Sequence, residues 1–303
     1  MRALVPVEVL VTGLNVVDVL VRLPEAVQHG GKHEVEDLVI QGGAPAGNAA
    51  SVLAALGHKV GFVARMGSDT LSGIARAEFA RHGVLADYFI EDQEASPAVA
   101  VVEIDPVSGE RTVFYSLRGY RSLKASDVPR AAVASSRLVL VDGYELEAAV
   151  TMLEAAREAG VSSVVDIEAG EPELLKSVLE LGEHLILPLE AGRRLTGRHE
   201  PGEVLRALSC LGPGQFIVTD GVRGSWGHTA SGVIHQEAIA ARVVDTTGCG
   251  DAYHGGYASA LLDGLDLVGR MRFAATIAAR VAEGLGGRAN LPSPRDRAIP
   301  IPA

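Results

Sequence analysis

Short apolar runs alternate with amphipathic stretches along most of this chain. The runs carry almost no internal polar residue, so each is predicted to be a strand buried on both faces of a sheet. They lie at residues 9–12, 60–64, 138–141, 164–167, 185–187 and 216–219. Helical patterns lie between them at 46–56, 70–82, 146–159 and 201–209. This alternation predicts an α/β fold with a central, mostly parallel sheet and helices on both of its faces.

Three further strand-like segments do not follow that alternation. They lie at 34–40, 98–104 and 111–115, and the last two flank the turn-rich stretch Asp-Pro-Val-Ser-Gly-Glu at 105–110. A hairpin is therefore predicted at that turn. We expect the three segments to form a small antiparallel sheet inserted into the main unit. An ordinary edge hairpin is the alternative interpretation.

The stretch Asp-Thr-Thr-Gly-Cys-Gly-Asp at 245–251 carries the clearest chemistry. An apolar run at 240–244 before it predicts a strand, and helical spacing follows it. The N–H groups of Gly248, Cys249 and Gly250 would be unsatisfied donors at a helix N-terminus, which is a ready anion site. A carboxylate at Asp251 is electrostatically costly beside an anion unless it takes part in chemistry. The alternative is a plain helix N-cap.

Two common nucleotide-binding motifs are excluded by their context. A dinucleotide fingerprint would need a strand after the first helix, but a second helical pattern follows at 265–284. The chain contains no Gly-x-x-x-x-Gly-Lys-Ser/Thr loop, which argues against a P-loop enzyme.

The stretch at 245–251 resembles the Asp-Thr-x-Gly-Ala-Gly-Asp signature of the ribokinase-like (PfkB) carbohydrate kinase family. The resemblance extends over nearly the whole chain through segments 13–18, 42–50, 53–57, 65–69 and 218–224. It implies one ribokinase-like domain over 1–303, with a β lid at about 14–41 and 97–117 that covers the sugar and often makes the dimer contact. Within the family, segments 253–255, 272–274 and 286–289 most resemble the sulfofructose-kinase-like branch.

The resemblance implies an ATP-dependent kinase that transfers the γ-phosphoryl group to a hydroxyl of a sugar. Asp251 would be the general base, and the N–H groups of Gly248, Cys249 and Gly250 would stabilise the transferred group. ATP and Mg²⁺ are the implied cofactors. A nucleoside kinase stays open as an alternative because the lid region offers Phe114, Tyr115 and Tyr120 for stacking. A non-catalytic sugar or nucleoside sensor on the same fold also stays open.

The resemblance assigns the remaining site residues by function. The sugar-binding set is Asp18, expected at a strand end, with Gly42, Gly43 and Asn48. The nucleotide-binding set is Thr219, Gly221, Gly224 and Gly250. Glu190 would hold Mg²⁺ through water, and Asp245 with the loop at 284–290 is a candidate for enclosing a monovalent cation such as K⁺.

The chain departs from the family pattern at three places. Leu187 stands where an Asn that contacts the nucleotide phosphates is expected, and Gly47 stands where the sugar-site Asn is expected, with Asn48 one place later. Cys249 replaces a small Ala. The helix dipole lowers the pKa of such a thiol and Asp251 raises it, so the direction stays open. Arg118 and Arg121, after the lid strands, are expected at a solvated rim, with contact to an anionic substrate as the alternative.

Composition narrows the partners and the compartment. The 303 residues carry a formal charge of −11, which argues against nucleic acid or an anionic membrane as a partner. The two cysteines, Cys210 and Cys249, form no disulfide or metal framework. No apolar run of 18 residues and no signal-peptide pattern is present, so we expect a cytoplasmic protein.

Overall fold

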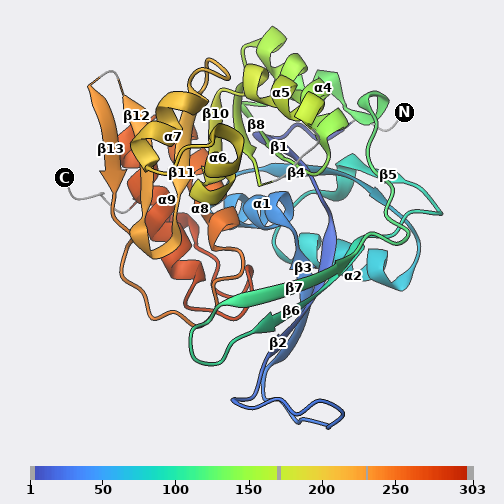
Figure 1. Ribbon diagram of the computed structural model, residues 1–303. Coiled ribbons are helices and arrows are strands. Elements are labelled where there is room, and N and C mark those ends of the chain that lie inside the picture. Colours follow the sequence, from blue (N-terminus) through green and yellow to red (C-terminus); the bar gives the residue numbers. More distant parts are fainter. Residues whose placement is uncertain (1–3, 169–171, 230, 299–303) are drawn as a thin grey trace.

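The computed structural model describes residues 4–168, 172–229 and 231–298, and its main feature is a large central sheet (Figure 1). The strand order is β13-β12-β11-β10-β9-β8-β1-β4-β5, and all neighbours are parallel except at β11-β12 and β12-β13. The strands are β1 (Val9–Thr12), β4 (Val60–Met66), β5 (Phe89–Glu91), β8 (Leu138–Asp142), β9 (Ser162–Asp166), β10 (His184–Pro188), β11 (Gln215–Thr219), β12 (Ser225–Thr229) and β13 (Gly232–Gln236). The predicted α/β class is confirmed.

Helices cover both faces of this sheet. One face carries α1 (Pro45–Ala55), α2 (Thr70–Arg81), α8 (Cys249–Leu262) and α9 (Leu267–Val281). The other carries α3 (Arg130–Ser135), α4 (Leu146–Ala159), α5 (Pro172–Leu181), α6 (Leu189–Thr196) and α7 (Pro201–Leu208). Successive residues of one strand pack into hydrophobic cores on opposite faces of the sheet. Val9 and Val11 pack on the face covered by α1, α2, α8 and α9, while Leu10 packs on the face covered by α3 to α7. Both side-chain directions are therefore buried, which explains the uninterrupted apolar runs.

Short 3₁₀ helices complete the described elements. They are η1 (Ala86–Tyr88), η2 (Ala125–Asp127), η3 (Gly221–Arg223) and η4 (Pro294–Ala298). None of the helices within the described ranges is long and apolar enough to cross a membrane.

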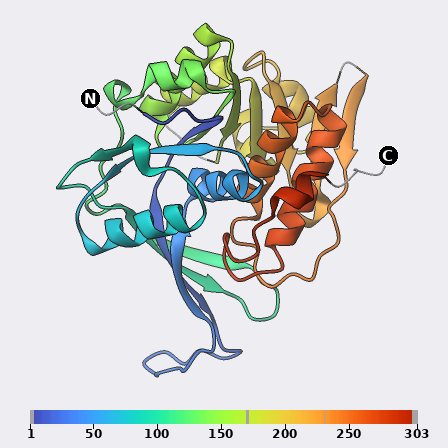
Figure 2. The ribbon, with the colours of Figure 1, turned by 180° about the vertical axis from the view of Figure 1, so that it is seen from behind.

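A second, small sheet projects from the main body on the side away from α4 and α5 (Figures 1 and 2). Its order is β3 (Leu38–Gly43), β2 (Val16–Arg22), β6 (Ala98–Ile104) and β7 (Arg111–Ser116). The predicted small sheet is confirmed; its outer pairs are antiparallel, while the central pair β2-β6 is parallel. The strand predicted at 34–40 begins at Leu38. Strand pairing across distant segments decides such directions, and local patterns do not show it.

The apolar run at 240–244 is not a strand. The N–H groups of Val244 and Asp245 both donate to the carbonyl of Ala282, at 2.8 and 3.3 Å, and Val243 is 46% exposed. The segment is therefore an extended connection that lies against the turn after α9. Apolar, β-branched composition favours extended backbone, but a strand also needs a free neighbour in a sheet.

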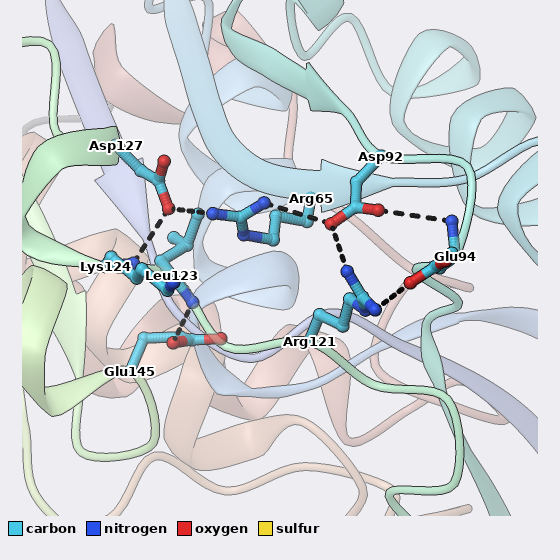
Figure 3. A network of polar contacts seen from close by, with 8 residues as sticks. All are labelled: Arg65, Asp92, Glu94, Arg121, Leu123, Lys124, Asp127 and Glu145. Carbon is cyan, nitrogen blue, oxygen red and sulfur yellow. Dashed lines mark hydrogen bonds and ion pairs between the residues drawn. The ribbon is translucent and has the colours of Figure 1, made fainter.

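An ion-pair network fastens the segment that returns from the small sheet (Figure 3). Arg65 on β4 lies between Asp92 and Asp127, at 3.0 and 2.6 Å. Arg121 pairs with Asp92 at 3.4 Å and also with Glu94. Arg121 is exposed, and two carboxylates already pair with its charge, which leaves little of it for an anionic substrate.

Glu145 is a buried carboxyl at the start of α4, beside the same segment (Figure 3). One oxygen accepts a hydrogen bond from the N–H of Leu123 at 2.8 Å, and the other accepts one from the hydroxyl of Tyr120. Burial raises the pKa of Glu145 to about 7. The folded protein thus holds this proton more tightly than the unfolded chain, where a Glu has a pKa of about 4.3. The resulting stabilisation is full below that value and is lost as the pH rises through 7.

Replacing Glu145 with Gln should remove this pH dependence. Between pH 5 and 8 we expect the free energy of unfolding of Glu145→Gln to improve on that of wild type by roughly 2 kcal/mol. Urea unfolding of both proteins across this range measures the difference. Glu147→Gln on the same helix is the matched control, because that carboxylate is exposed and accepts one bond from the N–H of Ala125. Parallel pH profiles for wild type and Glu145→Gln would contradict the assignment.

Candidate active site

The carboxyl ends of the parallel strands meet at one edge of the main sheet, where open α/β sheets bind ligands. Asp142 and Asp166 end β8 and β9 and are register partners there. Asp142 accepts hydrogen bonds from the N–H groups of Leu14, Ala46 and Tyr144, at 2.9, 3.3 and 3.0 Å. Burial raises its pKa to about 6. Asp142 therefore ties the start of the small sheet and of α1 to this edge.

The helix α8 begins at this edge with a glycine turn. Gly248 is its N-cap at φ 77°, and a Cβ there would lie 2.5 Å from the Cα of Gly287, so only glycine fits. A Cβ at Gly250 would meet nothing within 4 Å, which leaves open space over the helix start. The N–H of Cys249 donates a hydrogen bond to the carbonyl oxygen of Thr246, at 3.3 Å.

The free donors at the helix start differ from those expected. Among the described residues, no acceptor partners the N–H groups of Gly248, Gly250 and Asp251. Three N–H groups remain at the positive end of the helix, as predicted, but Asp251 takes the place of Cys249 in that set. The arrangement suits an anion of phosphate size.

Asp251 is held from the neighbouring helix. The side-chain N–H of Asn48 on α1 donates to Oδ2 of Asp251 at 2.7 Å. A Cβ at Gly255 on α8 would lie 2.8 Å from Val52 and 2.9 Å from the carbonyl of Ala49, so the two helices approach closely through this glycine. Oδ1 of Asp251 accepts no hydrogen bond from the part of the chain that the structure describes.

Asp18 lies inside the small sheet and not at a strand end, which corrects the expectation from sequence. It is the third residue of β2, in register with Gln41 and Ala100. Its carboxylate fills the space beside Gly43, where a Cβ would lie 2.0 Å from Oδ2. Burial raises the pKa of Asp18 to about 6, against the opposing charge of Arg288. The structure thus brings Asp18 and Gly43 together.

Gly42 serves a different partner, Arg288 in the turn after α9. A Cβ at Gly42 would lie 2.1 Å from Nη1 of Arg288. Nε of Arg288 donates to Oδ1 of Asn48 at 2.9 Å, and Nη2 donates to the carbonyl of Gly43 at 3.1 Å. Sequence reasoning assigned no role to Arg288. The sequence feature that could have indicated it is the group of glycines at 42, 43 and 47, because Gly42 and Gly47 make room for the guanidinium.

The proposed nucleotide residues lie on the loop after β11. Thr219 ends that strand, Gly221 opens η3, and a Cβ at Gly224 would lie 2.0 Å from the carbonyl of Gln236. The loop is at the same edge of the sheet as Asp142 and Asp166. Among the described residues, no hydrogen bond or ion pair joins it to Asp251.

The two proposed metal residues lie in different surroundings. Glu190 is exposed in the first turn of α6 and pairs with Arg193 at 3.5 Å. Asp245 is fully buried, and its oxygens accept the N–H groups of Thr247 and Gly286, at 2.8 and 2.7 Å. Asp245 therefore joins the glycine turn to the loop after α9. The described residues hold no group of three His, Cys, Asp or Glu placed to bind a metal.

Two further carboxyls at the edge were missed from sequence. Burial raises the pKa of Asp166 well above its ordinary value, and Oδ1 of Asp166 has no hydrogen-bond partner among the described residues. Burial, with the charge of Asp251, raises the pKa of Glu168 to about 7. The signal was an acid at or just after the end of β9. This concentration of carboxyls favours a cation brought in with a phosphate.

His254, one turn into α8, is a packing residue. Its ring nitrogens lie 2.7 Å from the carbonyl of Gly250 and 3.2 Å from that of Ile186, and burial lowers its pKa.

A Ser-His-Glu arrangement elsewhere is also structural. His58 lies 2.9 Å from Ser259 and 2.8 Å from Glu8, but Ser259 is 0% exposed and no substrate can reach it.

The direction of the Cys249 pKa, left open by the sequence, is upward. Burial raises the pKa of this thiol to about 12, with Arg111 opposing and Asp245 and Asp251 adding to the rise. The thiolate population at pH 7 is then about 10³-fold below that of an ordinary cysteine. Cys249 is a small, half-buried substitute for Ala whose thiol is a weak nucleophile at neutral pH.

We therefore expect Cys249 to resist alkylation. At pH 7, iodoacetamide should modify the exposed Cys210 first, and wild-type activity should survive that single modification. Cys249→Ala should retain activity within about threefold. Mass mapping of the modified peptides against residual activity measures this. Loss of activity in step with modification of Cys249 at neutral pH would contradict the raised pKa of this thiol.

A family model described as pfkB family carbohydrate kinase matches residues 8–294 of this chain. The chain belongs to this family. It is therefore a phosphotransferase with a hydroxyl acceptor, in the class of sugar and nucleoside kinases. The resemblance to the sulfofructose-kinase-like branch stays a prediction.

Two relatives illustrate the range within the PfkB family. A nucleoside kinase of Methanothermobacter thermautotrophicus is 26% identical over 293 residues, which cover 94% of this chain and 92% of that protein. An aminoimidazole riboside kinase of Salmonella typhimurium is 28% identical over 230 residues, with 71% and 72% coverage.

Solved structures of the family share the whole fold. Arabidopsis thaliana ribokinase, solved with ribose and ATP, superimposes with a TM-score of 0.80 at 23% identity, and covers 96% of this chain and 97% of its own. Adenosine kinase of Sinorhizobium meliloti gives a TM-score of 0.82 at 18% identity, with 97% and 99% coverage. Both sugar and nucleoside kinases thus have this architecture.

Proposed function

We propose that this PfkB-family protein is an ATP-dependent kinase that transfers the γ-phosphoryl group to a hydroxyl of a sugar. The observation that carries the proposal is the start of α8. There the carboxylate of Asp251 lies beside N–H groups that have no acceptor among the described residues, and one of its oxygens is held by Asn48. An anion-binding helix start next to a positioned base is what phosphoryl transfer to an alcohol requires.

In the proposed reaction, Oδ1 of Asp251 takes the proton of the acceptor hydroxyl. The hydroxyl oxygen forms a bond to the γ-phosphorus while the bond from that phosphorus to the β,γ-bridging oxygen breaks, and ADP leaves. The N–H groups of Gly248, Gly250 and Asp251 stabilise the charge on the transferred group. Each such donor contributes about 10²–10³ in rate.

The nucleotide and the metal are assigned to residues that follow β10 and β11 at the same edge of the sheet. Thr219, Gly221 and Gly224 would line the nucleotide, since their loop follows β11 at the edge where ligands bind. Glu190 would hold Mg²⁺ through water, and the ion would neutralise phosphate charge. This suits an ion that keeps several waters and takes one or two carboxylates with the phosphates.

A monovalent cation beside Asp245 is also proposed. The buried carboxylate supports it, because Asp245 fixes the loop at 284–290 whose carbonyls would complete the site. Activity in KCl compared with NaCl at equal ionic strength is the test. Equal rates would remove the cation from the proposal.

The small sheet, with the segments at about 14–41 and 97–117, is proposed to be the lid over the sugar. Asp18 supports this, because it is buried on the face of the sheet that packs toward the main body and offers two acceptor oxygens. Gly43 would contribute to the sugar site by leaving room for the carboxylate of Asp18. Asn48 was assigned to the sugar as well, but both ends of its amide have protein partners.

A nucleoside kinase is the second candidate, and the register of β7 favours it. Tyr115 is in register with Ala100, and Ala100 with Asp18, so Tyr115 lies on the same face as the proposed sugar ligand. It is exposed there and free to stack on a base. Phe114 lies on the opposite face, and Tyr120 is bonded to Glu145. The nucleoside kinase relative supports the same alternative.

A coupled ADP-release assay over sugars, sugar phosphates and nucleosides tests these proposals. Magnesium-dependent turnover with a free sugar supports the first proposal, and turnover with nucleosides alone replaces it with the second. Binding of either ligand without ATP turnover would identify a sensor instead.

The partner proposed is a second copy of this chain. The outer face of the small sheet carries one apolar row across its strands, with Ile40, Val101 and Phe114 at 53%, 40% and 57% exposure beside Val19. A homodimer through the lid would cover this row. Sedimentation equilibrium measures whether this homodimer forms.

We also propose a cytoplasmic location, which the use of ATP and the paucity of cysteines support.

A further inference from the structure

Arg288 is a buried cation in a slot built from three elements. A Cβ at Gly42 on β3 would lie 2.1 Å from Nη1, and a Cβ at Gly47 on α1 would lie 2.8 Å from Nη2. The guanidinium carbon is 5.2 Å from the ring centroid of Phe79 on α2. Burial lowers the pKa of Arg288 to about 10, so the group stays charged at neutral pH.

Glu78 supplies the main compensating charge for this cation. Among the carboxylates that oppose the effect of burial on Arg288, Glu78 acts most strongly, ahead of Asp18 and Asp251. Its own pKa is lowered to about 2 by His82, 3.7 Å away, and it accepts the N–H of Gly42 at 3.2 Å. Glu78 is therefore ionised, and the cost of burying Arg288 is reduced without a direct ion pair to Asp251.

Arg288 fixes which way the amide of Asn48 faces. A guanidinium can only donate hydrogen bonds, so the atom of Asn48 next to Nε must be the oxygen, at 2.9 Å. The amide nitrogen then faces Asp251, whose carboxylate can only accept, at 2.7 Å. A reversed amide would set donor against donor at one end and acceptor against acceptor at the other.

We propose that Arg288 and Asn48 form a positioning relay for Asp251, which holds Oδ2 in place and leaves Oδ1 to take the hydroxyl proton. The relay rests on the proposed function, in which Asp251 is the general base. Asn48 is then a positioning residue and not a sugar ligand. Arg288 acts on the reaction only through Asn48.

The relay also explains why Asn stands one place late in this chain. One step along an α-helix turns a side chain by about 100°. The amide at position 48 therefore faces α8, whereas position 47 faces the guanidinium. Any side chain at 47 would collide with Nη2 of Arg288. The glycine at 47, the displaced Asn and the buried Arg are thus one structural arrangement.

Steady-state kinetics on the full chain tests the relay, with the acceptor that the ADP-release assay identifies. Asn48→Ala should lower kcat roughly 10- to 100-fold and leave the acceptor KM within about threefold. Arg288→Met should lower kcat about tenfold. The double variant should lie within about twofold of Asn48→Ala, because no amide then remains to be oriented.

Two kinetic outcomes would overturn the relay. A raised acceptor KM with unchanged kcat in Asn48→Ala would make Asn48 a sugar ligand. Losses that multiply in the double variant would make Arg288 an independent structural residue. The control is Arg297→Met, whose side chain bonds the carboxylate of Asp263 away from the site. It should change thermal stability and not kcat.

A spectroscopic measurement separates the relay from the proposed function. In ¹⁵N-labelled protein, the side-chain NH₂ signal of Asn48 should shift in Arg288→Met and in Asp251→Asn, and should stay in place in Arg297→Met. If no acceptor is phosphorylated, the function fails while this signal still decides the relay. If Arg288→Met does not fold, the shift in Asp251→Asn and the kinetics of Asn48→Ala remain decisive. An unmoved signal in Asp251→Asn would end the proposal.

Discussion

Asp251→Asn is expected to lower kcat by roughly 10²–10⁴ while binding of sugar and ATP changes little. The substitution keeps the shape of the side chain and its bond partner Asn48, and removes the group that accepts the hydroxyl proton. Because the N–H groups at the start of α8 are untouched, the transferred phosphoryl group is still stabilised and some activity remains.

Steady-state kinetics with titration of ATP and acceptor measures this effect. Asp263→Asn, at the other end of α8, is the control, since that carboxylate pairs with Arg297 far along the helix from the glycine turn. The control should keep wild-type kcat. Activity of Asp251→Asn within about threefold of wild type would refute the base assignment.

Asp18→Ala should instead raise the acceptor KM by roughly 10²-fold, because hydrogen bonds to a charged acceptor contribute about 1.5–3 kcal/mol each. These bonds form in the ground state as well as in the transition state, so kcat should fall much less. The KM for ATP should stay unchanged. Asp37→Ala, an exposed carboxylate just before β3, is the control for charge on the small sheet. A rise in the ATP KM alone would reverse the proposed orientation of the site.

The same carboxylate predicts a pH dependence. Burial raises the pKa of Asp18 to about 6, so the free enzyme loses this acceptor pair as the pH falls through 6. The acceptor kcat/KM of wild type should therefore fall below pH 6 in step with protonation of Asp18. In Asp18→Ala that limb should be absent. An identical acid limb in both proteins would assign the titration to another group.

Several elements could be placed from sequence because their causes are local. The helix predicted at 146–159 matches α4, which ends where Gly160 takes a positive φ of 67°. The strand predicted at 98–104 matches β6, where alternate residues are buried against the main body. The run at 240–244 failed because it has the local composition of a strand and no neighbouring strand to pair with.

The candidate site likewise contains features with local causes and features that depend on distant segments. The glycine turn and the position of Asp251 at the helix start could be predicted from sequence, since a helix start and its first carboxylate lie within one short segment. The cluster of Asp166 and Glu168 and the role of Arg288 were not found. Their meaning depends on burial and on neighbours that come from other elements.

The sequence by itself determined the α/β alternation, the small inserted sheet and the glycine turn that begins α8, because backbone periodicity and glycine turns are properties of short segments. Only the tertiary structure decided which side chains meet there. Asn48 and Asp251 are 203 positions apart, and Asn48 and Arg288 are 240 positions apart. Their contacts exist because α1 packs on α8 and the turn after α9 enters the slot left by glycines. Such packing depends on the whole fold, and no local pattern records it.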